Sequence, residues 1–236
     1  MILVRSLLFN ALFYANLVLF LVLGSVFFFT PRLWSIAALK IWARSSVWLL
    51  RTVCGIRLEV TGLEHIPKGA VLVAGKHQSL FETFALLPCF ADPAMVMKRE
   101  LAWIPLFGWF SYKFRMIRVA RGAGASALKS MLREAGAAKT LNRQIIIFPE
   151  GTRRAPGAEP AYKPGAAALY AALDLPCVPF ALNSGRHWPR RSLLRFPGTV
   201  TIAFLPAIPA GLPRREFAAR LEREVETATR ALHAKP

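Results

Sequence analysis

The chain has 236 residues, which is long enough for one large domain with a buried core. Apolar residues make up 55% of it and charged residues only 19%, yet 31 lysines and arginines against 13 acids give a formal net charge of +18. A chain that is both this basic and this apolar favours an anionic membrane surface as partner and argues against nucleic acid, whose binders are usually basic and polar. Its three cysteines, far apart in apolar segments, argue against a disulfide framework and a cysteine metal site.

The first 30 residues are predicted to be a membrane anchor. Residues 7–29 form one apolar run with four polar or small interruptions. As a helix the run would extend roughly 35 Å, and the hydrocarbon core of a bilayer is about 30 Å thick. A cleaved signal peptide is the alternative, but the run is long and no small-x-small cleavage site follows it before Pro31. A retained transmembrane or membrane-embedded helix is therefore favoured.

Residues 31–52 are predicted to form an amphipathic helix. One of its stripes is apolar and aromatic, and a neighbouring stripe is cationic. The stripes consist of Trp34, Ile41 and Trp48, and of Lys40, Arg44 and Arg51. Such a helix can lie at the lipid headgroups or dock on the main domain, and the sequence leaves both open. Basic residues follow the first apolar segment in larger number than they precede it, which predicts an inner-membrane protein whose main domain faces the cytoplasm.

From residue 53 to residue 236, short apolar runs alternate with helical patterns. The predicted strands are 56–60, 70–74, 94–98, 116–119, 144–148, 177–182 and 199–205. The predicted helices are 80–90, 126–141, 164–174 and 214–233. This alternation predicts an α/β domain with a mixed, mostly or partly parallel sheet flanked by helices.

His77 and Glu82 stand where a predicted strand ends and a helix begins, the sheet edge at which α/β proteins commonly place active sites. Two interpretations compete. In the first, Ser79 and Glu82 form a capping box that only starts the helix. In the second, Glu82 orients His77, which acts as a general base. The segment alone does not decide between them.

A second candidate stretch, IIIFPEGTRR at 145–154, carries a buried strand into a polar loop. Gly151 permits a tight turn, Thr152 offers a hydroxyl, and Arg153 can bind a phosphate through two parallel hydrogen bonds. A solvated turn with stray arginines is the plainer interpretation.

Further cations lie at other predicted element ends. Arg118 and Arg121 close a predicted strand in RMIRVARGAG, and Lys163 precedes a Pro-Gly pair at the start of a helix. Each of these side chains can hold an anion or face solvent.

Taken in order, these pieces resemble the 1-acyl-glycerol-3-phosphate acyltransferase family of the PlsC type. The first block of that family, H-x4-D with a serine two positions after the histidine, is matched by His77, Ser79 and Glu82, with glutamate in the place of aspartate. Its second block is best matched by Arg121, and its third, F-P-E-G-T-R, is complete at 148–153.

The resemblance covers about residues 60–185 and implies both the family's fold and its activity. That activity is transfer of a fatty acyl group from acyl-CoA or acyl carrier protein to the sn-2 hydroxyl of lysophosphatidic acid, giving phosphatidic acid, with the donor as co-substrate and with no other cofactor and no metal. His77 would take the proton of the hydroxyl while Glu82 orients the imidazole. Ser79 and Arg118 would support the site. The residues that would surround the substrate phosphate are Arg121, Glu150, Gly151, Thr152, Arg153 and Lys163.

Two other functions stay open on the sequence. One is a related acyltransferase with another acceptor, such as glycerol 3-phosphate, a lyso-aminolipid or a lipid A precursor. The other is a basic, membrane-bound module without catalysis, which an inactive His77 variant would argue against.

Overall fold

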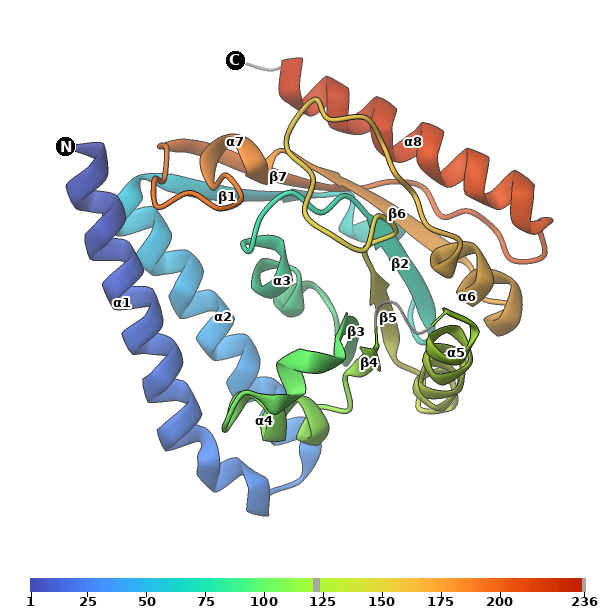
Figure 1. Cartoon of the computed structure of the whole chain (residues 1–236), viewed down its shortest axis with the longest axis horizontal. Coiled ribbons are helices and arrows are strands. Elements are labelled where there is room, and N and C mark those ends of the chain that lie inside the picture. Colours follow the sequence, from blue (N-terminus) through green and yellow to red (C-terminus); the bar gives the residue numbers. More distant parts are fainter. Residues whose placement is uncertain (121–123, 235–236) are drawn as a thin grey trace.

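A computed structural model describes residues 1–120 and 124–234 of the chain (Figure 1). The described residues contain a seven-stranded sheet in the order β1-β7-β6-β2-β5-β3-β4. Its strands are β1 (Ile56–Thr61), β2 (Val71–Gly75), β3 (Pro93–Lys98), β4 (Ile117–Val119), β5 (Gln144–Ile147), β6 (Cys177–Leu182) and β7 (Gly198–Phe204). Neighbouring strands pair in parallel, except that β6 and β7 are antiparallel. The predicted mixed sheet is confirmed, and each predicted strand is present to within one residue at either end.

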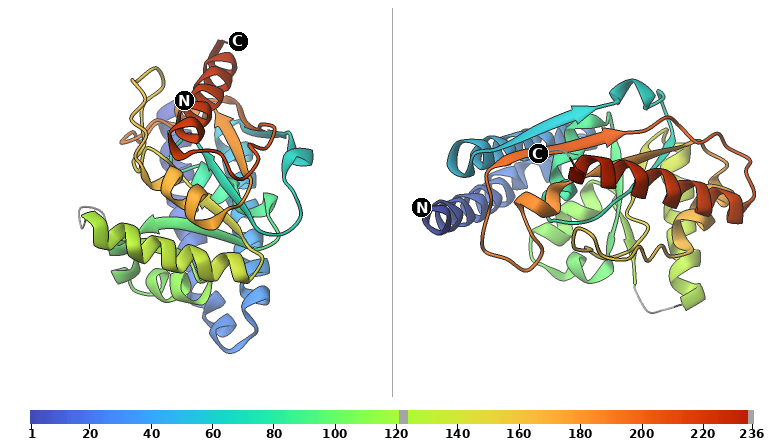
Figure 2. Two further views of the ribbon diagram at one scale, coloured as in Figure 1. Left: turned by 90° about the vertical axis from the view of Figure 1, so that its right-hand side faces the viewer. Right: turned by 90° about the horizontal axis from the view of Figure 1, so that it is seen from above.

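Helices cover both faces of the sheet (Figures 1 and 2). One face carries α2 (Arg32–Cys54), α3 (Glu82–Ala85) and α4 (Phe107–Lys113), with α1 (Ile2–Leu23) packed against α2. The other face carries α5 (Gly124–Thr140), α6 (Gly165–Leu173) and α8 (Arg214–Ala234). The short α7 (Ser184–His187) lies in a connection, as do the four 3-10 turns found within residues 1–120 and 124–234. These turns are η1 (Gly24–Phe29), η2 (Leu63–His65), η3 (Leu87–Cys89) and η4 (Arg99–Trp103).

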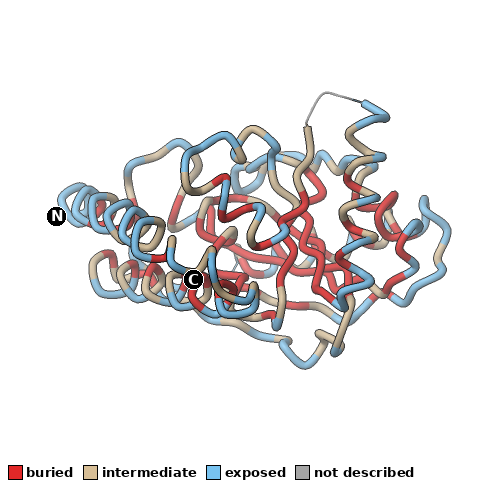
Figure 3. The backbone as a smooth tube through the Cα atoms, turned by 90° about the horizontal axis from the view of Figure 1, so that it is seen from below, coloured by how far each residue is buried: buried red, intermediate tan, exposed pale blue. Residues whose placement is uncertain are grey.

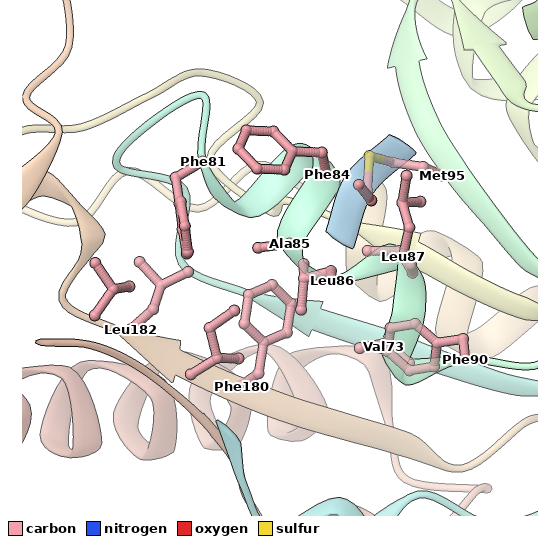
Figure 4. Close-up of a cluster of buried hydrophobic side chains, with 14 of the residues drawn as sticks. Val73, Phe81, Phe84, Ala85, Leu86, Leu87, Phe90, Met95, Phe180 and Leu182 are labelled. Carbon is pink, nitrogen blue, oxygen red and sulfur yellow. The ribbon is translucent and has the colours of Figure 1, made fainter. Parts of the chain in front are cut away.

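The core has two halves, one on each face of the sheet. Along β2, Val73 points into the half beneath α2 and α3, while Leu72 and Ala74 point into the half beneath α5, α6 and α8. Strands β2, β5 and β6 are buried along their whole length (Figure 3). Burial on both faces explains why these strands are continuous apolar runs in the sequence. Figure 4 shows the half beneath α3, where Phe81 and Phe84 belong to the same buried cluster as Phe180 of β6.

Two helical regions differ from the prediction. The helix expected at 80–90 is a single α turn, α3, followed by η3, because Pro88 inside the segment cannot continue an α-helix. Helix α4 was not predicted, since Pro105 and Gly108 interrupt its apolar pattern. A side chain at Gly108 would meet the carbonyl oxygen of Ala102 at 1.9 Å, so the glycine allows η4 and α4 to pack tightly.

The N-terminal hairpin of α1 and α2 lies along the main domain. Ile2–Phe29 is long and apolar enough to cross a membrane by length and composition. Near its start, Asn10 donates a hydrogen bond to the carbonyl of Leu193 at 3.2 Å. Near its end, the Phe28 ring packs 4.5 Å from that of Phe110. The segment therefore touches the main domain close to both of its ends.

Helix α2 combines features of the two alternatives left open by the sequence. It buries one face against the sheet and the first connections, so it is docked on the domain. The apolar stripe predicted for it stays exposed all the same. The buried face includes Ile36, Ala43 and Leu50, and the exposed stripe is Trp34, Ile41 and Trp48.

Candidate active site

The two loops singled out in the sequence meet at one edge of the sheet. His77 follows β2, and the Pro149–Arg154 loop follows β5, the parallel neighbour of β2. Since the carboxyl ends of parallel neighbours lie at the same edge, the two loops are adjacent. They are also joined directly, because the backbone N–H of Arg154 donates to the carbonyl of His77 at 2.8 Å.

His77 and Glu82 form a hydrogen-bonded pair at this edge. The distance from His77 Nδ1 to Glu82 Oε1 is 2.8 Å. The Glu82 side chain is fully buried, whereas that of His77 is 12% exposed. The imidazole stacks on the ring of Phe148 with 4.2 Å between the ring centroids, which fixes its plane. One ring nitrogen of His77 is thus held by the carboxylate while the ring reaches the surface.

Four donors surround the Glu82 carboxylate. Oε1 accepts from the backbone N–H groups of Gln78 and Ser79 at 2.6 and 2.7 Å, and Oε2 accepts from the hydroxyl of Ser184 at 2.7 Å. His77 supplies the fourth contact, so its Nδ1 carries the proton. Nε2 is then left as the basic nitrogen.

The contacts expected from the capping interpretation and from the catalytic interpretation are both present. The Glu82 carboxylate does reach back to the N–H of Ser79, as a capping box requires, while the Ser79 hydroxyl accepts from the N–H of Phe81 at 3.2 Å. The same carboxylate oxygen also holds His77. The two interpretations do not exclude each other, because one carboxylate oxygen accepts several hydrogen bonds.

The loop after β5 turns its polar side chains outward and its acid inward. Gly151 has a φ of +64°, a conformation that favours glycine. Lys163 crosses this turn, with its Cδ 3.5 Å from the place where a Cβ of residue 151 would lie. Thr152 and Arg153 are exposed beside it. Four predicted phosphate ligands are thus brought together on the surface.

Glu150 was predicted to lie with the residues around the substrate phosphate, but its side chain is buried. Its side chain is 1% exposed and accepts from Lys76 Nζ at 3.1 Å, with Arg154 Nε 3.9 Å away. Lys76 in turn donates to Glu226 of α8 at 2.6 Å. A buried carboxylate committed to a lysine fixes the loop and does not face a phosphate, which it would repel.

The cations at β4 lie apart from the pair. Arg118 approaches Glu134 with Nε 3.8 Å from Oε2, and its guanidinium lies 3.8 Å from the Tyr112 ring centroid. Strand β4 is three positions from β2 across the sheet, roughly 14 Å at the usual strand spacing of about 4.8 Å. Arg121, the predicted second-block residue, lies outside the described residues.

Three residues of the site were missed by sequence reasoning. Lys76 had a signal, because a lysine directly after an apolar strand has to find a partner when it is buried. Gln78 is buried too, and its side-chain carbonyl accepts from the N–H of Gly185 at 3.0 Å. Ser184 gave no signal, since it lies 102 residues from its partner Glu82. Within the part of the chain that the structure describes, three or more histidine, cysteine and acidic side chains do not gather as a metal site would need.

The chain is similar in sequence to known acyltransferases. A family model described as Acyltransferase matches residues 57–183, which is more than half of the chain. The chain is 38% identical over 169 residues to a 1-acyl-sn-glycerol-3-phosphate acyltransferase of Pseudomonas aeruginosa, covering 72% of this chain and 66% of that protein. It is 30% identical to the Limnanthes alba protein of the same name, covering 69% and 57%. The chain thus spans about two thirds or less of these relatives.

The fold has a solved counterpart. The crystal structure of the 1-acyl-sn-glycerophosphate (LPA) acyltransferase PlsC from Thermotoga maritima superposes with a TM-score of 0.84, covering 100% of this chain and 99% of that one. Identity between the two is 21%, so this likeness shows a shared α/β fold and carries no argument about substrates.

Proposed function

This chain belongs to the acyltransferase family, and on that premise we propose that it transfers a fatty acyl group from a thioester to the sn-2 hydroxyl of lysophosphatidic acid, giving phosphatidic acid. One observation carries the proposal, namely the pair of His77 and the buried Glu82 at 2.8 Å. We take lysophosphatidic acid as the acceptor because the relatives are named 1-acyl-sn-glycerol-3-phosphate acyltransferases.

The proposed chemistry begins with proton removal. An alcohol is a weak nucleophile at neutral pH, and His77 Nε2 takes its proton as the oxygen attacks the thioester carbonyl. The tetrahedral intermediate then collapses, the carbon–sulfur bond breaks, and the leaving thiolate takes the proton back from the imidazolium. The reaction needs no nucleophilic side chain, because the acceptor hydroxyl fills that role.

Glu82 is well placed to assist each proton transfer. Among the described residues, its carboxylate accepts hydrogen bonds from neutral groups and His77 alone, so its negative charge remains available to the imidazolium. It also keeps the proton on Nδ1, which leaves Nε2 free to act as the base. In a fully buried position this charge acts through a lower dielectric than it would in water.

The donor and the membrane complete the proposal. Acyl-CoA and acyl carrier protein both deliver a thioester and serve as co-substrates, so the protein requires no bound cofactor. The main domain lies on the cytoplasmic face of the inner membrane and contacts its anionic lipids. Since Ile2–Phe29 touches the domain near both ends, a perpendicular span would pull the domain into the hydrocarbon. The α1–α2 hairpin therefore lies within one side of the bilayer, with the stripe of Trp34, Ile41 and Trp48 in the headgroup region.

The test is an acyl-transfer assay with purified protein in detergent. Labelled acyl-CoA is offered with lysophosphatidic acid, other lysolipids, or glycerol 3-phosphate. We expect turnover with lysophosphatidic acid that is lost in His77→Ala and kept in His65→Ala, which alters a histidine of the short η2 turn. If the protein prefers another acceptor, the proposed substrate is wrong. If His77→Ala keeps its turnover, the proposed mechanism is wrong.

A further inference from the structure

A small cationic cavity lies beside the segment that carries His77 and Glu82, and Leu80 is the residue of that segment that lines it. It has a volume of about 180 Å³ and lies between α1, Arg153 and the loop that follows α7. Three arginines line it, namely Arg153, Arg191 and Arg195. None of its described lining residues is acidic.

Arg195 is a buried cation without a carboxylate partner among the described residues. It is 6% exposed, and its hydrogen bonds go to backbone carbonyls and to the Asn10 side-chain oxygen at 2.8 Å. Its Nε atom is buried and unpartnered. Burial lowers the pKa of the guanidinium to about 10, because the charged form has lost water without gaining an opposite charge. An anion in the cavity would relieve that cost.

The other two arginines that line the cavity are exposed. Arg191 is exposed and has a φ of +55°, a left-handed conformation that is uncommon for a residue with a side chain and recurs where loops clamp ligands. Arg190 donates to the backbone carbonyl of Arg153 at 2.6 Å, which joins this loop to the one after β5. The three guanidinium groups thus come from two connected loops.

We propose that this cavity binds the phosphate of the acceptor, with Arg191 and Arg195 completing a site of which the family motif supplies only Arg153. The assignment rests on the proposed function. Asn10 and Tyr14 of the apolar helix α1 form one wall, so a lipid leaving the membrane along α1 would bring its headgroup here. Leu80 lies between His77 and Glu82 in the chain, so a phosphate held here would keep the rest of the acceptor beside the segment of that pair.

The dimensions and charges favour the acceptor over the donor and over the other basic cavity. A volume of about 180 Å³ suits a phosphate monoester, whereas sites that enclose larger ligands measure about 300–1,000 Å³. A larger cavity of about 340 Å³ beside α5 also contains arginines, including Arg118 and Arg133. There, however, Glu134 approaches Arg118 and offsets the charge.

The test compares Arg191→Ala with Arg133→Ala, which removes one charge from the cavity beside α5. For Arg191→Ala we expect KM for lysophosphatidic acid to rise about ten-fold or more, with KM for acyl-CoA and kcat changed little. Glycerol 3-phosphate should inhibit this variant more weakly by a similar factor, and Arg191→Lys should be intermediate. Arg133→Ala should match the wild type. Arg195→Lys, checked for its melting temperature, tests the buried position without removing its charge and should raise the same KM.

Each contrary result has a separate meaning. Wild-type turnover with an unchanged acceptor KM in Arg191→Ala and Arg195→Lys would overturn this assignment and leave the proposed function standing. A rise in the acyl-CoA KM alone would give the cavity to the donor, and a rise in the acceptor KM of Arg133→Ala alone would move the phosphate to the α5 cavity. Failure of the wild type to acylate lysophosphatidic acid would overturn the proposed function itself.

Discussion

Glu82 and Glu150 are both buried glutamates in the segments that follow neighbouring parallel strands, yet their charges are surrounded by different partners. Glu82 accepts from two backbone N–H groups, one hydroxyl and His77, none of which is a permanent cation. Glu150 faces Lys76 at 3.1 Å, with Arg154 farther away. In the proposed reaction, the Glu82 charge is available to an imidazole that becomes cationic, whereas the charge of Glu150 is already matched by Lys76.

The difference explains how one sheet edge can hold both a reactive group and a rigid support. A carboxylate held by neutral donors can stabilise an imidazolium when it forms. A carboxylate paired with a buried lysine stabilises the fold only while both partners are present, since the remaining charge would be left uncompensated. The comparison therefore predicts losses of turnover at Glu82 and losses of stability around Glu150.

The largest effect on activity is expected for Glu82→Gln. The amide can keep an oxygen toward His77, Gln78 and Ser79 and can donate to Ser184, so the loop should stay folded. What it loses is the negative charge facing the imidazolium. We expect kcat to fall by about 10²–10⁴-fold with a near-normal melting temperature. Full turnover by folded Glu82→Gln would show that the carboxylate only caps α3.

Lys76→Met tests the other half of the comparison, namely the stability that the ion pair of Lys76 and Glu150 provides. The substitution leaves Glu150 buried without its main cation, which costs about 3–5 kcal/mol for a buried pair that loses one partner. Denaturant unfolding in detergent measures this loss, and Lys98→Met at the exposed end of β3 is the matched control. An unchanged free energy of unfolding would mean that Glu150 is not held by Lys76.

The sequence was sufficient for the sheet and for part of the site. Its strands are short apolar runs with clear boundaries, and the residues after β2 and β5 meet because parallel strands share an edge. Helices were harder to predict where aromatic residues, proline and glycine are mixed, as in α4 and η4. There, close packing of Gly108 on Ala102 decides the structure, and that contact has no local signature.

The partners of the site residues could not be predicted for a related reason. Glu226 lies 150 residues from Lys76, and Arg195 is 185 residues from Asn10, so each pairing depends on how whole elements pack. Sequence patterns reveal the local geometry of a loop but not what faces it. This is why Glu150 was assigned to the phosphate, although its side chain points inward to Lys76.

Arg153→Ala tests whether Arg153 and Glu150, two residues of the loop after β5, have different roles. Glu150 and Arg153 are three residues apart, but the first is buried and the second is exposed and lines the cationic cavity. We expect KM for the acceptor to rise about ten- to a hundred-fold, since one charge-assisted contact contributes roughly 1.5–3 kcal/mol, while KM for the donor changes little. Arg223→Ala on the exposed side of α8 is the control. Equal effects on both substrates would indicate a distorted loop and not a lost phosphate contact.

The smallest effect is expected for Glu226→Gln, which asks whether α8 helps to hold the loop of His77. Lys76 donates to Glu226 at 2.6 Å, and the Glu226 side chain is 14% exposed, so water screens part of this ion pair. Lys76 keeps Glu150 as a partner in the variant, and the glutamine side-chain oxygen can still accept a hydrogen bond from Lys76 Nζ. The activation barrier should therefore rise by about 1 kcal/mol, which lowers kcat about five-fold. Both KM values should stay unchanged, because His77 is shifted and the substrate contacts are not.

Glu224→Gln is the matched control, since that residue pairs only with Arg220 on the same helix among the described ion pairs. A kcat equal to that of the control would confine α8 to packing, and the positioning of His77 would then rest on Glu82 and on the neighbouring strand ends.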